Sequence, residues 1–119
     1  MAVRAPHCLL VVVLVGAAAL AGCLAPREHA VLPAVSPPMA AWAVAQWPDA
    51  TAGQLSHGRE SMEGHCTSCH GMPSPRHETA KDWPDVMQDM AGNAKLGAAD
   101  EAAMLRYILS ARNAQPDHG

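Results

Sequence analysis

Phenylalanine is absent from this sequence, tyrosine occurs once and tryptophan three times. Large aromatic side chains supply much of the buried area in most cores, so this chain must obtain its interior in another way. Runs of basic residues are also missing, which argues against a nucleic-acid partner. No segment alternates polar and apolar residues as a strand would, and the sequence therefore predicts an all-α fold.

The first part of the chain, residues 1–22, is interpreted as a secretory signal. A positive charge at Arg4 precedes the apolar run 9–20, which is too short to span a bilayer comfortably. The sequence Leu20-Ala21-Gly22-Cys23 then resembles the lipobox of bacterial lipoproteins. This resemblance implies that cleavage leaves Cys23 as the first residue and that its thiol carries lipid. The alternative is an uncleaved anchor helix, and either interpretation places the rest of the chain on a membrane, outside the cytoplasm.

Cysteine is scarce once this segment is set aside. Of the four cysteines, Cys8 leaves with the signal and Cys23 carries lipid, so Cys66 and Cys69 remain. A disulfide would suit an exported protein, whereas a thioredoxin-like redox pair needs a βαβ context that the sequence does not show. A zinc site needs four ligands, so histidines would have to complete it. The mature chain offers His29, His57, His65, His70, His77 and His118.

The stretch HCTSCHG, residues 65–71, contains the pattern C-x-x-C-H, by which c-type cytochromes attach haem. Residues three apart lie on one face of a helical turn, so both sulfurs can reach one edge of a porphyrin. Residues 52–112 resemble the monohaem cytochrome c family. The resemblance implies one covalent haem c held by Cys66 and Cys69, with His70 as the proximal iron ligand.

The predicted organisation is a signal peptide (1–22), a lipid-anchored Pro/Ala-rich tether (23–50), a haem domain (51–114) and a short tail (115–119). The haem domain is close to the lower size limit for an apolar core, and we expect the haem to complete it. A proline-rich tether extends by about 3.1 Å per residue and would set the domain up to roughly 80 Å from the membrane. Trp42 and Trp47 would either dock on the domain or lie at the lipid interface.

About three short helices are expected around the haem, at residues 51–65, 82–93 and 98–112. In the last helix, Met104, Tyr107, Ile108 and Ala111 follow the spacing of a buried face. Glycine in the middle of a helix costs about 1 kcal/mol relative to alanine. By resemblance to small cytochromes c, Gly58 would allow the C-terminal helix to cross closely, with Tyr107 as its partner.

The second axial ligand is predicted to be Met90. The stretch PRHETAKDWPDVMQDM resembles the T-x-x-x-W-x-x-v-v-x-x-M pattern of small monohaem cytochromes c, in which the terminal methionine is the ligand. His77 and Met87 are the alternatives. The resemblance also implies that a carbonyl at Pro73 or Pro75 accepts a hydrogen bond from His70.

These features predict a membrane-anchored, one-electron carrier on the periplasmic side, which exchanges electrons with redox protein partners and has no catalytic residues. One variant is a cytochrome subunit of a dehydrogenase or oxidase complex. The alternative class is a haem protein with an open distal site, either a gas-binding sensor or a small haem enzyme. Asp82, Asp85 and Asp89 give one helix an acidic side, interpreted as a solvated face.

Overall fold

The computed structural model describes residues 29–114, so the predicted signal peptide, Cys23 and the tail 115–119 lie outside the described residues. In residues 29–114 four α-helices follow one another: α2 (Pro37–Gln46), α3 (Ala52–His65), α4 (Trp83–Ala94) and α5 (Ala98–Ala114). A 3₁₀ turn, η2 (Cys66–Ser68), follows α3 directly. No strand occurs in residues 29–114, which confirms the all-α prediction for this part of the chain, with one helix more than expected.

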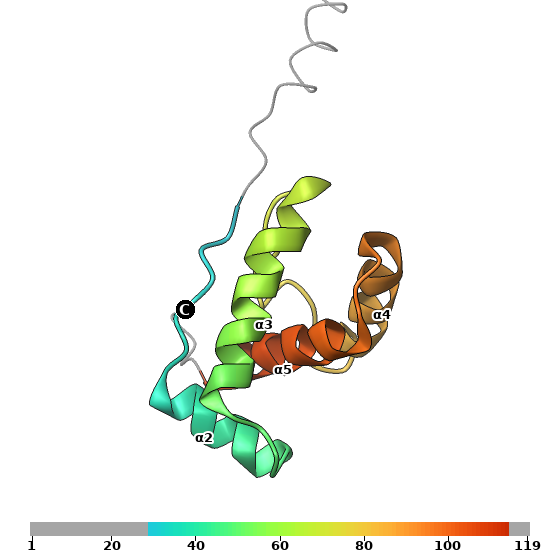
Figure 1. Ribbon diagram of the computed structural model, residues 1–119. Helices are drawn as coiled ribbons and strands as arrows, with labels where there is room; N and C mark the ends of the chain where they lie inside the picture. The colour runs from blue at the N-terminus through green and yellow to red at the C-terminus, as the bar shows by residue number, and fades with distance from the viewer. Residues whose placement is uncertain (1–28, 115–119) are drawn as a thin grey trace, which may run out of the picture.

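Helix α5 is the centre of the arrangement, because α2, α3 and α4 all pack on it. Figure 1 shows α3 crossing α5, with α2 and α4 lying toward different parts of it. The core extends from this crossing and is built from aliphatic and methionine side chains and two aromatic residues, Trp83 and Tyr107. Its most deeply buried members include Leu55, Met62, Met104, Tyr107 and Ile108. Helices α3 and α4 make little direct contact with each other, although both pack on α5.

The close crossing of α3 and α5 depends on Gly58. A Cβ atom at this position would lie 2.5 Å from the carbonyl carbon of Ala103 and 3.0 Å from the nitrogen of Met104. The prediction of a close approach at Gly58 is therefore confirmed. The atoms nearest to such a Cβ belong to the α5 backbone at Ala103 and Met104, one turn before Tyr107, and a contact with the Tyr107 ring stays a prediction.

The segment that precedes α3 is part of the folded domain and is not an extended tether. Pro37 and Pro38 occupy the first helical positions of α2, where a missing N–H costs no hydrogen bond. Leu32, Met39 and Ala43 are buried in the same core cluster as residues of α3 and α5. The prediction that residues 23–50 extend is therefore wrong for residues 37–46, and the folded domain begins before residue 51.

The two tryptophans of this segment dock on the domain. Trp42 and Trp47 meet edge to face, with ring centroids 5.7 Å apart. The Arg106 guanidinium of α5 lies 5.4 Å from the centroid of the Trp47 ring. Arg106 also donates to both carboxylate oxygens of Asp49, at 3.1 and 3.2 Å, and it lowers the pKa of that carboxyl. Arg106 therefore holds Trp47 and Asp49, which follow α2, against the central helix α5.

The boundaries of α3, α4 and α5 agree with the predicted ones to within two residues. Thr51 caps α3 by accepting a hydrogen bond from the Gln54 amide at 3.1 Å, as its position before the helix suggests. Helix α4 continues past Gly92 and Asn93 to Ala94, and Lys95 adopts the left-handed conformation with a φ of 54°. The predicted end of this helix at residue 93 is therefore one residue early, and the predicted end of α5 at residue 112 is two residues early.

Tyr107 gives the fold a dependence on alkaline pH. Its hydroxyl donates to the Pro33 carbonyl at 2.7 Å, and burial raises the pKa of Tyr107 to about 12 from 10.0, with Arg59 acting in the opposite direction. Because the fold favours the neutral phenol, this contribution is complete below pH 10 and is lost as the pH rises toward 12.

We expect Tyr107→Phe to lower the free energy of unfolding by about 1 kcal/mol at pH 7, the usual value of one hydrogen bond. The variant should also lose part of the decline in stability between pH 10 and 12. Chemical unfolding followed by circular dichroism at several pH values checks both results. An unchanged alkaline profile in Tyr107→Phe would contradict the assignment.

Candidate functional site

A cavity of about 840 Å³ lies between the C-terminal part of α3, the loop 70–78 and α4. Its walls are formed by side chains from these elements and from the start of the described chain: His29, Ala30, Met62, Cys66, His70, Gly71, Met72, Pro73, Ser74, His77, Glu78, Trp83, Val86, Met87, Met90 and Ile108. The volume falls within the range of small-molecule and cofactor sites, about 300–1,000 Å³. The little contact between α3 and α4 leaves this space open in the folded chain.

The predicted attachment residues lie where α3 ends. The turn η2 begins at Cys66, and in a 3₁₀ turn residues i and i+3 lie one above the other. Cys66 and Cys69 are free thiols in the structure, so the alternative of a disulfide between them is not formed here. Cys66 lines the cavity, and burial raises the pKa of its thiol. Cys69 is exposed and does not contribute to the cavity wall.

His70 is held by its own loop. Its Nδ1 lies 2.7 Å from the carbonyl oxygen of Gly71. A carbonyl can only accept, so Nδ1 carries the proton and the lone pair remains on Nε2, the tautomer that suits metal ligation through Nε2. The predicted acceptors, Pro73 and Pro75, are wrong: Gly71 takes this role. The Pro75 carbonyl instead accepts from the Trp83 indole at 2.8 Å.

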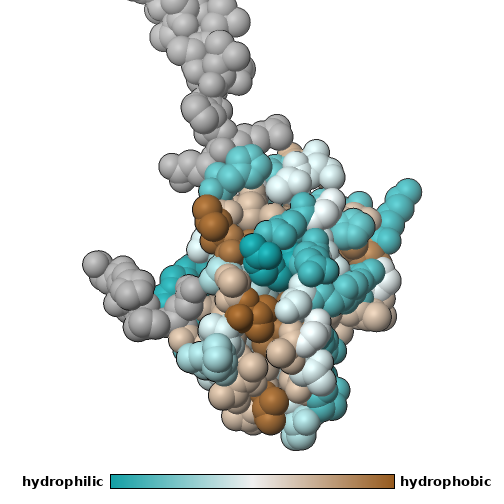
Figure 2. Space-filling view, turned by 60° about the vertical axis from the view of Figure 1, so that its left-hand side comes forward, coloured by the Kyte–Doolittle hydropathy of each residue, from teal (hydrophilic) through white to brown (hydrophobic). Residues whose placement is uncertain are grey.

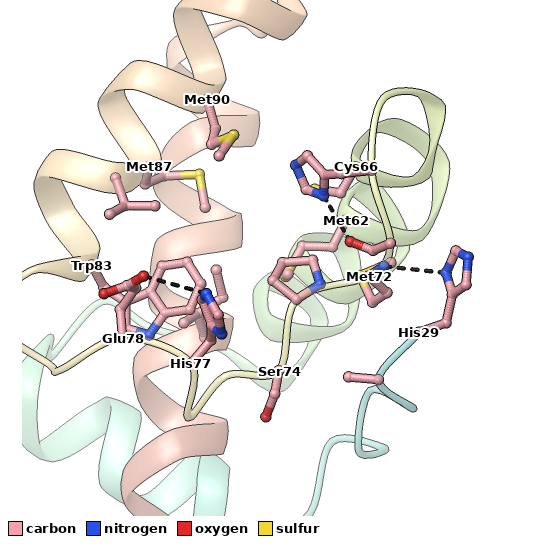
Figure 3. Close-up of a pocket in the computed structure, with 16 residues that line it drawn as sticks. His29, Met62, Cys66, Met72, Ser74, His77, Glu78, Trp83, Met87 and Met90 are labelled. Carbon is pink, nitrogen blue, oxygen red and sulfur yellow. Dashed lines mark hydrogen bonds and ion pairs between the residues drawn. The ribbon is translucent and has the colours of Figure 1, made fainter. Parts of the chain in front are cut away.

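The thioethers of Met87 and Met90 lie on the wall of the cavity opposite the turn η2. Figure 3 shows Met87 and Met90 projecting from α4 toward the side that carries Cys66 and Met62. Met87 is only 2% exposed and belongs to the core cluster, whereas Met90 is 39% exposed. The two methionines therefore differ in burial. Met87 is packed in the core, and Met90 is less constrained by packing.

His77, the other alternative ligand, also reaches the cavity wall but faces water. Its side chain is 71% exposed, and its Nε2 lies 3.6 Å from a carboxylate oxygen of Glu78. All the candidate ligands that the sequence indicates, His70, His77, Met87 and Met90, therefore line one cavity together with Cys66.

Sequence reasoning did not place His29 or Met72 at the cavity wall, although His29 is among the histidines that the sequence offers as ligands. The Met72 amide donates to His29 Nδ1 at 3.1 Å, and the Ala30 amide donates to the Met72 carbonyl at 3.0 Å. These two bonds hold residues 29–30 against the loop that follows His70. No local pattern could have revealed this contact, because the two segments are far apart in the sequence.

The residues present fit a covalently attached haem. The cavity is mainly apolar, as a porphyrin requires, and one wall supplies a thiol and an imidazole while the other supplies thioethers. Residues 29–114 contain no group of three or more His, Cys, Asp or Glu side chains that could hold a metal ion.

No protein-family model, curated protein or solved structure matches this chain. Within residues 29–114, no helix is both long and apolar enough to cross a bilayer.

Proposed function

We propose that this chain binds one haem c covalently and carries single electrons between redox proteins on the periplasmic side of a membrane, anchored through lipid on Cys23. The observation that supports this most is the position of the C-x-x-C-H motif. Cys66 and His70 line a cavity of about 840 Å³ whose opposite wall presents thioethers. The proposed fold is accordingly cytochrome c-like, with the haem as part of its core.

Each residue of the site has a distinct task in this proposal. Cys66 and Cys69 bind the haem through thioether bonds, and His70 binds the iron through Nε2 while Gly71 keeps the proton on Nδ1. Met90 would supply the second protein ligand to the iron. A bound haem would supply one-electron chemistry, and a thioether ligand would raise its reduction potential relative to a second imidazole. The apolar side chains around the cavity exclude water from the site.

The absorption spectrum of purified protein from a host that matures c-type cytochromes tests this function. We expect a covalent haem that remains with the polypeptide after denaturation and changes its spectrum on reduction. We also expect the far-red band that reports methionine bound to ferric iron. Folded protein without covalent haem would contradict the proposal.

Met90 and Met87 form a matched pair for testing the ligand. We expect Met90→Ala to abolish the far-red band and to lower the reduction potential, with little loss of stability, because Met90 is 39% exposed. Met87→Ala should keep the band but lower the free energy of unfolding by about 3 kcal/mol, because Met87 is buried in the core. Spectra, redox titration and chemical unfolding of both variants check this. A band that survives in Met90→Ala and disappears in Met87→Ala would reverse the assignment.

Carbon monoxide separates electron transfer from the alternative of an open distal site. A haem with both axial positions occupied takes up carbon monoxide slowly or not at all when reduced. Rapid, stoichiometric uptake by the unmodified protein would favour a gas-binding sensor or a small haem enzyme. The Met90→Ala variant is the positive control, since it should bind the gas rapidly.

A further inference from the structure

The outer side of the N-terminal segment carries no formal charge. Residues 29–48 contain no Asp, Glu, Lys or Arg, although charged residues stand on both sides, at Glu28 and Asp49. One side of α2 is buried through Met39 and Ala43. Apolar and small side chains reach the surface on the other side of α2 and in the residues before it: Val31, Ala34, Pro37, Pro38, Ala41, Val44 and Ala45. We call these exposed residues the N-terminal face.

This face contains most of the large hydrophobic side chains that are exposed in residues 29–114. Val31 is 92% exposed and Val44 is 49% exposed; Met90, beside the cavity, is the third. Figure 2 brings forward the side on which Figure 1 draws the N-terminal segment, and hydrophobic residues reach the surface there. A helix with an apolar buried side and an uncharged outer side is unusual for a surface exposed only to water.

The chain between this face and the proposed lipid anchor is short. The described structure starts at His29, and its first residues are fixed: Ala30 is hydrogen-bonded to Met72 and the Pro33 carbonyl to Tyr107. Only residues 24–28 separate Cys23 from His29. Even fully extended, this linker spans roughly 20 Å. An anchored molecule therefore remains close to the lipid surface and must turn one side toward it.

The distribution of charge indicates which side of the molecule faces the lipid. The opposite candidate, α4, exposes Asp82, Asp85 and Asp89, and carboxylates lose favourable hydration when they approach lipid. The N-terminal face loses little, because it has no charge to desolvate. We propose that the N-terminal face lies on the lipid surface in the anchored protein, with the acidic side of α4 exposed to water. This inference rests on the proposed lipid anchor at Cys23 and does not depend on the haem.

Spin labels on the full-length, lipid-modified protein bound to phosphatidylcholine vesicles test this orientation. A nitroxide is introduced by Val44→Cys on the N-terminal face, and by Gln88→Cys on exposed α4 as the matched control. On binding vesicles, the Val44 label should collide more with lipid-soluble oxygen and less with a water-soluble nickel complex. The Gln88 label should not change. Ala41→Cys gives a second position on the face if Val44→Cys does not fold.

The result should be the same on uncharged and anionic vesicles, because the proposed contact is apolar. A Val44 label that remains open to the nickel complex while the protein is bound to vesicles would overturn the proposal. Shielding from both reagents would also overturn it, since another protein chain would then cover the face. Failure of the protein to sediment with vesicles would remove the anchor on which the inference depends.

The same samples also test, independently, whether haem is attached to Cys66 and Cys69. Thioether bonds leave Cys66 and Cys69 unable to react with the label, as a disulfide would, so haem attachment is supported by a parent protein that takes up no label and keeps its haem absorption after denaturation. If the parent does react, the proposed function fails, and the orientation is measured in a Cys66→Ala/Cys69→Ala background. The two proposals can therefore fail independently.

Discussion

Gly58→Ala is expected to lower the free energy of unfolding by about 3 kcal/mol, at the upper end of the usual cost of overpacking. The added methyl group would lie 2.5 Å from the carbonyl carbon of Ala103, well inside contact distance. Backbone atoms cannot rotate away as a side chain can, so α3 and α5 would have to separate. Because α5 also supports α2 and α4, the whole core would loosen. Chemical unfolding followed by circular dichroism measures the loss.

Gly53→Ala is the matched control on the same helix. The nearest atom to a Cβ there is Thr51 Oγ1 at 3.8 Å, which is ordinary contact. We expect a change below about 1 kcal/mol, in the stabilising direction, because alanine is the better helix former. Equal destabilisation of the two variants would mean that the helix crossing does not depend on a glycine at position 58.

The helices beside the attachment motif could be predicted because local signals agree there. Thr51 caps α3, and Asp100 and Glu101 lie in the first turn of α5, so residue type and position indicate the same boundaries. The buried face of α5 was also predictable: Met104, Tyr107 and Ile108 are each at most 1% exposed. The period of a helix specifies which residues turn inward, even without a known partner.

The fate of residues 29–50 could not be predicted, because their role depends on contacts distant in sequence. Two adjacent prolines and a lack of charge suggested an extended tether, yet Pro37 and Pro38 begin a helix equally well. What decides between these outcomes is α5, which offers Arg106 to Trp47 and the Tyr107 hydroxyl to Pro33. Propensity alone contains no information on such partners.

In the candidate site, too, local patterns predict some features, whereas others depend on contacts between residues distant in the sequence. The spacing of Cys66, Cys69 and His70 predicts the chemistry of the site, and the absorption spectrum tests that prediction. The details of the cavity wall could not be predicted: the acceptor for His70 is Gly71, and His29 enters from the N-terminal segment. Met87 and Met90 both have helical spacing from Trp83, and the structure adds that Met87 is buried whereas Met90 is exposed.

Removal of both attachment thiols should have the largest effect of all. In Cys66→Ala/Cys69→Ala we expect protein that contains no covalent haem and has lost most of its helical circular dichroism and cooperative unfolding. The cavity of about 840 Å³ separates α3 from α4, so without a ligand its apolar walls face water. Domains of this size have only about 5–10 kcal/mol of stability, and the unfilled core would remove much of it.

Ser68→Ala is the control for this experiment, because Ser68 lies between the two cysteines and is exposed. It should retain the haem spectrum, the helical signal and the unfolding midpoint of the parent. The double variant and the control are produced in the same maturation-competent host and compared by absorption, circular dichroism and thermal unfolding. A double variant that is colourless yet as stable as the control would show that the four helices form a core without haem, and the cavity would then need another explanation.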